Sequence, residues 1–289
     1  MDRIIFGDNQ FFAINHMSEE KARAQALKFK NTRAVIDVLD IVYDLGIRTF
    51  MCTTHDRIAE ICDHIRSNPE RYKGFKIYPC MPYAHKYVNA VTELGIIGSL
   101  KRFAPGSMLG TIFRGGIAGA KMDLIGLMKL LVDAEMKMFN GIENGVIFLQ
   151  NIVTDLLLGL GMREFFVAYS DYVKKKYCAE PGFITMNLPR LLEILEEVGI
   201  ENPIVCSSIN KIGFRMCGGK EVYESIIREK KFRCIAMSTL ASGAILPKEA
   251  VEYVCGLEGV NSILFGASSK EHIEQTKTLI ERSSKIVNV

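Results

Sequence analysis

The sequence predicts an α/β fold, a (β/α)8 TIM barrel with an insertion between strands 3 and 4, built as a single domain over residues 1–289. Eight short apolar runs recur along the chain, a helical segment follows each run, and no Pro- or Ser-rich linker divides them. With 48% hydrophobic residues and a formal charge of +3, a chain of 289 residues can bury one large core.

Each predicted strand is a short apolar run that ends at a polar or turn-forming residue. The eight runs are residues 3–6, 47–52, 75–80, 146–149, 182–184, 204–206, 232–237 and 262–265. Turn chemistry marks several boundaries: Gly46 precedes the second run, Pro82 follows the third, and Gly199 lies before the sixth.

The helices between these strands are predicted from apolar residues that recur every three or four positions. The helix before the second strand has its apolar positions at Val35, Val38, Leu39, Val42 and Leu45. The helix after the fifth strand has Pro189 in its first turn, where proline is favoured. Its apolar positions are Leu191, Leu192, Leu195 and Val198.

About sixty residues separate the third and fourth predicted strands, and they contain the insertion, residues 96–140. A Gly-rich stretch at 114–119 precedes a strongly apolar helix near 124–138. In a barrel such a segment leaves the mouth at which active sites lie, and its glycines permit hinge motion. It is therefore either a lid or an excursion that packs on the side of the barrel, which the apolar helix favours.

The composition excludes several classes of partner. Lys and Arg total 36 against 33 Asp and Glu, without a basic stripe, so we predict no nucleic-acid partner. No export signal and no apolar run long enough for a membrane span is present, which predicts a cytoplasmic protein without a membrane partner. The eight Cys residues lack paired spacing, so we expect reduced thiols. No metal-binding spacing is present either, and we predict no metal site. Homo-oligomerisation stays open.

The stretch 261–273 carries the most informative single motif. A short apolar strand runs into Gly266, then into Ser268 and Ser269, and then into a helix. Glycine lets backbone approach a ligand closely, and serines at a helix start can hold a phosphate together with the helix N–H groups. An ordinary capped helix is the alternative interpretation of the same residues.

Four stretches along the chain resemble the aldo-keto reductase family. They are Leu45-Gly46-Ile47-Arg48-Thr49-Phe50, Gly182-Phe183-Ile184-Thr185-Met186-Asn187, Ile235-Ala236-Met237-Ser238-Thr239-Leu240-Ala241-Ser242-Gly243 and Ile263-Leu264-Phe265-Gly266-Ala267-Ser268. The resemblance implies a barrel that binds NADP or NAD and transfers hydride to or from a carbonyl group. The predicted cofactor-binding residues are Ser238, Leu240, Gly266, Ser268, Ser269, Lys270 and Gln275.

The catalytic positions depart from the family's pattern. The family protonates its carbonyl substrate with an Asp, Tyr, Lys and His set. The residues that stand at or near those positions are Met51, Asp56, Cys80-Met81-Pro82 and Gln150 or Asn151. The pair that holds the nicotinamide amide is matched by Ile184 and Thr185. The family's proton route is therefore missing, a loss of about 10²–10⁴ in rate for general acid catalysis.

Polar residues at the strand ends are the replacement groups that the sequence offers. For proton transfer we predict His55 and His85, with Asp8 or Asp56 orienting one of them and Tyr83 as a reserve acid. A helix-start histidine bonded to backbone or solvent is the alternative for both imidazoles. The predicted substrate-binding residues are Asn9, Gln150, Asn151, Asn187, Ser208 and Asn210.

Three functions remain open from the sequence. The first is an NAD(P)-linked oxidoreductase that acts on a small-molecule substrate with a non-standard proton donor. The second is a cofactor-free or metal-assisted lyase, isomerase or hydrolase of a phosphorylated or hydroxylated metabolite. The third is a non-catalytic barrel that binds a nucleotide or metabolite.

Overall fold

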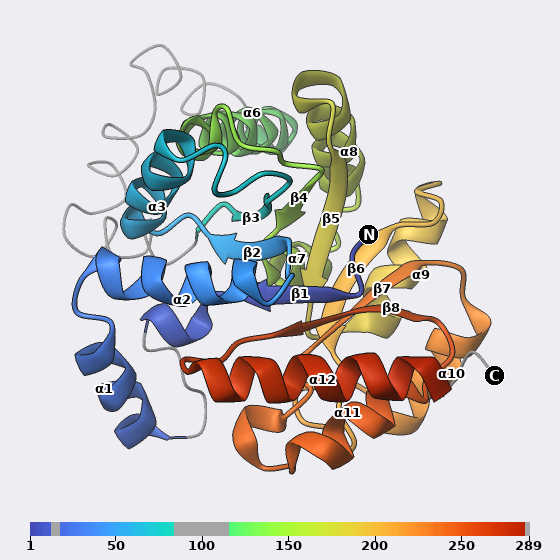
Figure 1. The fold of residues 1–289 in the computed structure, drawn as a ribbon. Helices are drawn as coiled ribbons and strands as arrows, with labels where there is room; N and C mark the ends of the chain where they lie inside the picture. Colours follow the sequence, from blue (N-terminus) through green and yellow to red (C-terminus); the bar gives the residue numbers. More distant parts are fainter. Residues whose placement is uncertain (13–17, 84–115, 287–289) are drawn as a thin grey trace.

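The computed structural model describes residues 1–12, 18–83 and 116–286 and contains a closed barrel of eight parallel strands in the order β1 to β8. The helices surround this barrel (Figure 1). The predicted (β/α)8 fold is confirmed. The strands are β1 (Ile4–Gly7), β2 (Thr49–Thr53), β3 (Lys76–Met81), β4 (Val146–Leu149), β5 (Glu180–Thr185), β6 (Ile204–Ser208), β7 (Arg233–Met237) and β8 (Val260–Phe265).

The described helices follow the strands in the expected alternation, with some additions. They are α1 (Glu19–Lys28), α2 (Thr32–Asp44), α3 (Asp56–Ser67), α6 (Gly116–Met136), α7 (Asn151–Gly159), α8 (Glu164–Tyr177), α9 (Leu188–Glu197), α10 (Lys220–Glu229), α11 (Pro247–Cys255) and α12 (Lys270–Ile286). Short 3-10 turns are η1 (Asn9–Phe12), η2 (Lys137–Phe139) and η3 (Ala241–Gly243). The sequence did not predict α1, because its apolar residues do not form a stripe at helical spacing.

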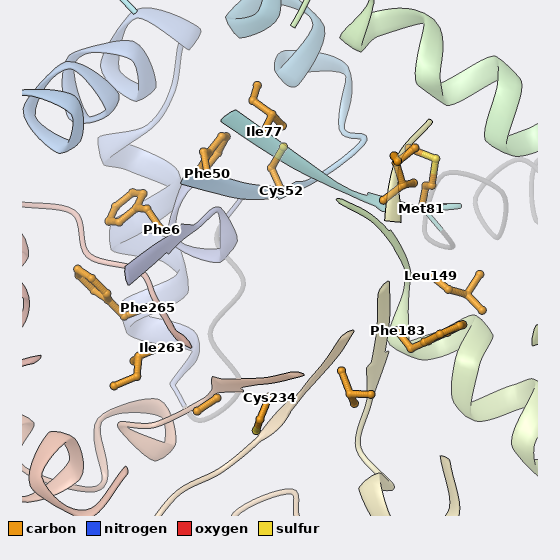
Figure 2. Packing of buried hydrophobic residues seen from close by; sticks show 14 of the residues in the cluster. Phe6, Phe50, Cys52, Ile77, Met81, Leu149, Phe183, Cys234, Ile263 and Phe265 are labelled. Atoms are coloured by element: carbon orange, nitrogen blue, oxygen red, sulfur yellow. The ribbon is translucent and has the colours of Figure 1, made fainter. Parts of the chain in front are cut away.

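Alternate residues of each strand face two different cores, as the two-residue repeat of a strand requires. Ile5, Met51 and Phe148 belong to the cluster of buried residues inside the barrel. Their neighbours Phe6 and Phe50 belong to the larger cluster between the strands and the helices, part of which Figure 2 shows. Because all eight strands are parallel, the residues that follow them lie at one common mouth.

The apolar helix of the insertion, α6, packs on the barrel. Met128, Val132 and Met136 are buried in the core between strands and helices, and α6 contacts α8 and β3. Three donors, Tyr172, Tyr177 and Lys176 on α8, share the carboxylate of Asp133 and fasten the two helices together. Gly116 and Gly119, which the sequence places in a Gly-rich stretch before the helix, lie within α6. Residues 96–115 of the proposed lid, residues 96–140, lie outside the described part of the chain, and the lid stays a prediction.

Gly182 on β5 is required by the packing of the barrel interior. A Cβ at this position would lie 2.4 Å from Cε1 of Phe148, a fully buried ring. We expect Gly182→Ala to lower the free energy of unfolding by roughly 1–3 kcal/mol, the usual cost of overpacking a core. Urea unfolding measures it, with Gly159→Ala at the end of α7 as the control, where no atom lies within 4 Å. Equal stability of both variants would contradict this packing.

Disulfides, metal sites and membrane spans are three features on which the sequence carries expectations. All eight cysteines are described and none forms a disulfide. Within the described ranges, no group of three His, Cys, Asp or Glu side chains is arranged to hold a metal ion. In the same ranges, no helix combines the length and the hydropathy that crossing a bilayer requires.

Candidate functional site

A cavity of about 560 Å³ opens at the carboxyl ends of the strands. Its volume falls in the usual range for small-molecule and cofactor sites. The floor is apolar and is formed by Met51, Ile184, Met237 and Leu264, while polar side chains follow the strand ends around it. Asp8 and Arg215 are the charged residues among the described lining residues, so the cavity carries one carboxyl group and one cation.

Asp8 follows β1 and is the buried acid of the cavity, with a residue exposure of 6%. Its Oδ2 accepts hydrogen bonds from the backbone N–H and the hydroxyl of Thr53, both at 2.8 Å. Burial raises the pKa of Asp8 and is the largest effect, while the two Thr53 bonds act in the opposite direction. A carboxyl with a raised pKa can exchange a proton closer to neutral pH than an ordinary Asp.

Tyr83 follows β3 and presents a phenol to the same cavity. Burial raises its pKa above the ordinary value of 10.0, and the nearby Asp8 carboxylate adds to the shift. The phenol therefore keeps its proton at neutral pH and can donate a hydrogen bond. Glu135 of α6 holds the Tyr83 backbone, because both of its carboxylate oxygens accept the Tyr83 N–H at 3.1 Å.

Glu135 is a residue that the sequence analysis missed. It is 2% exposed and also accepts the Thr54 hydroxyl at 2.6 Å, so α6 fixes the loops that follow β2 and β3. Its position in the apolar helix predicts a core-facing residue, and a buried carboxylate there needs partners. Those partners lie 52 and 81 residues away in the sequence, so no local pattern could identify them.

Gly266, at the end of β8, allows close contact with the loop that follows β1. A Cβ at Gly266 would lie 2.0 Å from Oε1 of Gln10, a buried side chain whose Nε2 donates to the Gly7 carbonyl at 2.7 Å. Both residues line the cavity. The close approach at Gly266 is therefore made by a side chain of the protein itself, and the predicted contact of Gly266 with a ligand stays a prediction.

The loop after β7 forms the wall opposite β2 and β3. Ser238, Leu240 and Gly243 line the cavity there. Ser238 and Gly243 have positive φ values of 55° and 93°, which turn the loop back over the barrel mouth. Arg215, in the loop after β6, lies on the same side and also has a positive φ of 56°.

Solved structures with this architecture identify the fold. The chain matches the thermostable aldo-keto reductase Tm1743 with a TM-score of 0.58 and 10% identity, covering 99% of this chain and 94% of that one. It matches the aldose reductase of Giardia lamblia with a TM-score of 0.56 and 10% identity, over 99% and 91% of the two chains. The chain has the aldo-keto reductase fold. The predicted resemblance is confirmed at this level.

A variant of Gox0644, a third protein with this fold, has been solved in complex with NADPH. It matches this chain with a TM-score of 0.54 and 8% identity, over 99% of this chain and 89% of that one. No protein-family model matches the chain, and no curated protein matches it in sequence. Identities this low establish the fold alone. The roles of individual residues must therefore be argued from the cavity.

The predicted substrate-binding residues fall into two groups within this aldo-keto reductase fold. Asn9, Gln150 and Asn151 line the cavity. Asn187 is instead the N-cap of α9, where its Oδ1 accepts the Arg190 N–H at 3.4 Å. Ser208 and Asn210 are fully buried below the mouth and outside the lining.

Both buried residues support the loops above them. Ser208 donates to the Ser238 hydroxyl at 3.2 Å, and Asn210 bonds both the N–H and the carbonyl of Phe214 at 2.8 Å. Ser208 therefore holds Ser238, and Asn210 holds Phe214, the residue before Arg215. The sequence placed both near the mouth but gave no sign of which group each one would contact.

Of the predicted cofactor-binding residues, Ser238, Leu240 and Gly266 line the cavity. Ser269 caps α12 by accepting the His272 N–H at 3.3 Å, which agrees with the capped-helix alternative. The Ser268 carbonyl accepts a hydrogen bond from Lys28 of α1. Ser268, Ser269, Lys270 and Gln275 lie outside the lining, and contacts from them to a cofactor stay predictions.

His55 is the N-cap of α3. Its Nδ1 accepts the Arg57 N–H at 3.2 Å, and its ring stacks on Phe12 with 4.2 Å between centroids. These contacts are those of a helix-capping histidine. The centroid of the His55 ring lies 6.3 Å from that of the Tyr83 ring. Asp56 is exposed at the start of α3, and both residues lie outside the lining. His85 lies outside the described residues.

We expect His55→Ala to lower the free energy of unfolding by roughly 1 kcal/mol, because it removes a helix cap. His55→Asn keeps a capping acceptor and is expected to retain wild-type stability and turnover. Urea unfolding and a turnover assay on the two variants measure these effects. A large loss of turnover in His55→Asn at unchanged stability would support the acid–base role predicted from the sequence instead.

Proposed function

We propose that the protein is an NAD(P)-linked oxidoreductase that interconverts a small polar carbonyl compound and its alcohol, with Asp8 as the proton-exchanging group. One observation carries the proposal. The same cavity is lined by a buried carboxyl and a protonated phenol, Asp8 and Tyr83, and by the cation of Arg215 at the opposite wall. This arrangement suits a molecule that has an anionic part and a reacting carbonyl.

The cavity residues fit the phosphate part of a dinucleotide. Gly243, Gly266 and Arg215 line the cavity after β7, β8 and β6, and Arg215 supplies positive charge. A phosphate site formed by the last loops is frequent in this barrel architecture. The structural neighbour Gox0644 was solved with NADPH, which supports the choice of this cofactor class.

In this proposal the residues that would hold the nicotinamide group differ from those of the aldo-keto reductase family. Ile184 lines the cavity floor, while Thr185 is fully buried and donates its hydroxyl to Asp155 of α7. The amide side chains of Gln150 and Asn151, after β4, are the groups in the lining that can hold a carboxamide. A bound dinucleotide would supply or accept the hydride.

The chain's own residues perform the proton chemistry in this proposal. Asp8 gives a proton to the oxygen of the carbonyl during reduction and takes it back during oxidation. Tyr83 donates a hydrogen bond to the same oxygen as negative charge develops on it. The apolar floor excludes water from the reacting atoms and strengthens both interactions.

The test is direct binding of NADPH, NADP, NADH and NAD to the full chain, followed by cofactor oxidation with a panel of small aldehydes and ketones. Calorimetric titration reports the binding of all four dinucleotides, and the fluorescence of the reduced nicotinamide gives a second signal for NADPH and NADH. We expect saturable binding of one dinucleotide per chain and carbonyl-dependent oxidation. Absence of binding for all four dinucleotides would contradict the proposed function.

A cofactor-free lyase or isomerase is the second candidate, and the β5 end favours it. Thr185 is engaged with Asp155 and lies below the mouth, so the position that holds the nicotinamide amide in the family is not available here. Asp8 and Tyr83 could then move protons on a hydroxylated metabolite without a dinucleotide. The binding experiment separates the two candidates.

A further inference from the structure

Arg215 belongs to the loop between β6 and α10, and this loop is held in one shape by its own hydrogen bonds. Asn210 is fully buried, and its side chain donates to the Phe214 carbonyl and accepts the Phe214 N–H, both at 2.8 Å. Such a two-point contact fixes the orientation of the peptide that leads into Arg215. Asn210 is therefore a positioning residue for Arg215.

The clamped loop also packs against the wall formed after β7. Phe214 and Leu240 pack together on a small buried cluster of Ala241, Ile245 and Ala250. The guanidinium of Arg215 lies near the Phe214 ring, with 5.5 Å from Cζ to the centroid. Arg215 thus lies beside the loop of Ser238 and Gly243 and lines the cavity with it.

The backbone of Arg215 is in the left-handed region, with a φ of 56°. This conformation is unfavourable for an arginine, and such residues persist where surrounding contacts impose them, often at functional sites. The Asn210 clamp supplies those contacts. The structure therefore maintains an unfavourable backbone at the position that brings this cation into the cavity.

Arg215 is exposed and lines the mouth of the cavity. No carboxylate of the described residues forms an ion pair with it, and it is the cation of the described cavity lining. In the barrel order, β6 and β7 lie opposite β2 and β3. The cation is therefore across the mouth from Tyr83 and the carboxyl of Asp8.

We propose that Arg215, positioned by Asn210, binds a phosphate or diphosphate group of the molecule that fills the cavity. Guanidinium groups bind phosphate oxygens with two parallel hydrogen bonds and keep their charge at every physiological pH. The assignment rests on the proposed function where the phosphate belongs to a dinucleotide. The same chemistry would serve a phosphorylated substrate.

The experiment uses calorimetric titration of the full chain with NADPH and, separately, with inorganic diphosphate. Arg215→Asn removes the charge while keeping a residue that tolerates positive φ, and Arg215→Lys restores the charge without the planar fork. Arg228→Met, on the exposed face of α10, is the control for a lost arginine. We expect Arg215→Asn to weaken both ligands by about tenfold or more, the usual effect of losing a charged hydrogen bond.

Arg215→Lys is expected to recover part of this affinity, and Arg228→Met all of it. Weaker diphosphate binding in Arg215→Asn, with no NADPH binding by any form, would retain the assignment for a phosphorylated substrate and overturn the proposed cofactor. NADPH and diphosphate affinities in Arg215→Asn equal to those of the wild type would overturn the role of Arg215 and leave the cofactor proposal intact. Failure of both ligands to bind the wild type would overturn both.

Discussion

Asp8→Asn is expected to lower turnover by about 10²–10⁴-fold, the usual contribution of a positioned acid or base. The amide has a similar shape and can still accept hydrogen bonds from Thr53, so the cavity should keep its structure. It cannot exchange a proton at neutral pH. NADPH affinity should therefore change little while the rate of the chemical step falls.

The same substitution is expected to raise the unfolding temperature at neutral pH. Burial raises the pKa of Asp8 above its ordinary value of 3.8. The folded state then binds the proton more tightly than the unfolded state, so the contribution of Asp8 to stability is fully present below pH 3.8 and is lost as the pH rises through the raised pKa. At neutral pH the buried carboxylate destabilises the fold, and Asn removes this effect.

Thermal unfolding at several pH values and a steady-state assay measure both effects of Asp8→Asn. Asp171→Asn makes the same chemical change on the exposed surface of α8 and is the control. A variant that retains wild-type turnover would exclude Asp8 as the proton-exchanging group. A variant that unfolds at a lower temperature at neutral pH would show that the Thr53 bonds stabilise the carboxylate more than burial disfavours it.

Tyr83→Phe is expected to lower turnover by about 10²–10³-fold, the usual cost of removing one donor to a developing oxyanion. The ring and the backbone N–H that Glu135 accepts are both retained, so the loop should keep its position. Because burial raises the pKa of Tyr83, the phenol stays protonated across the neutral range. Wild-type activity should accordingly show no loss from Tyr83 ionisation below pH 10.0.

Steady-state kinetics with and without the phenol test this role. The reduction in kcat should exceed any change in KM, because the hydrogen bond strengthens in the transition state. Tyr253→Phe removes a hydroxyl that donates to Glu224, away from the cavity, and serves as the control. Unchanged kcat in Tyr83→Phe would assign the oxyanion to another donor, and equal losses in both variants would indicate a general effect on stability.

The barrel could be predicted from the sequence because its determinants are local. Each strand is one apolar run, and each helix repeats its own apolar pattern. The glycines that end these elements are adjacent to them in the sequence. Closing the barrel then requires only that neighbours pair in order. For the same reason, polar residues that directly follow strands could be expected at one mouth, and Asp8 and Gln150 line the cavity there.

Other side chains depend on contacts beyond the strand ends, which the sequence does not reveal. A polar residue at a helix start has the same local pattern whether it faces a ligand or caps the helix, which is why Asn187 and His55 were proposed as site residues. Arg215 enters the cavity through a left-handed backbone and a side-chain clamp five residues earlier. Neither feature leaves a recognisable pattern in the sequence.

The proposed proton transfer depends on the pKa of Asp8, because it requires a carboxyl group that titrates above the usual range for aspartate. Carbon-13 NMR titration of the aspartate carboxyl carbons, with the Asp8 resonance assigned from its absence in Asp8→Asn, measures this pKa directly in the folded protein. We expect a value above 3.8, because burial outweighs the two hydrogen bonds from Thr53. A value at or below 3.8 would contradict the account.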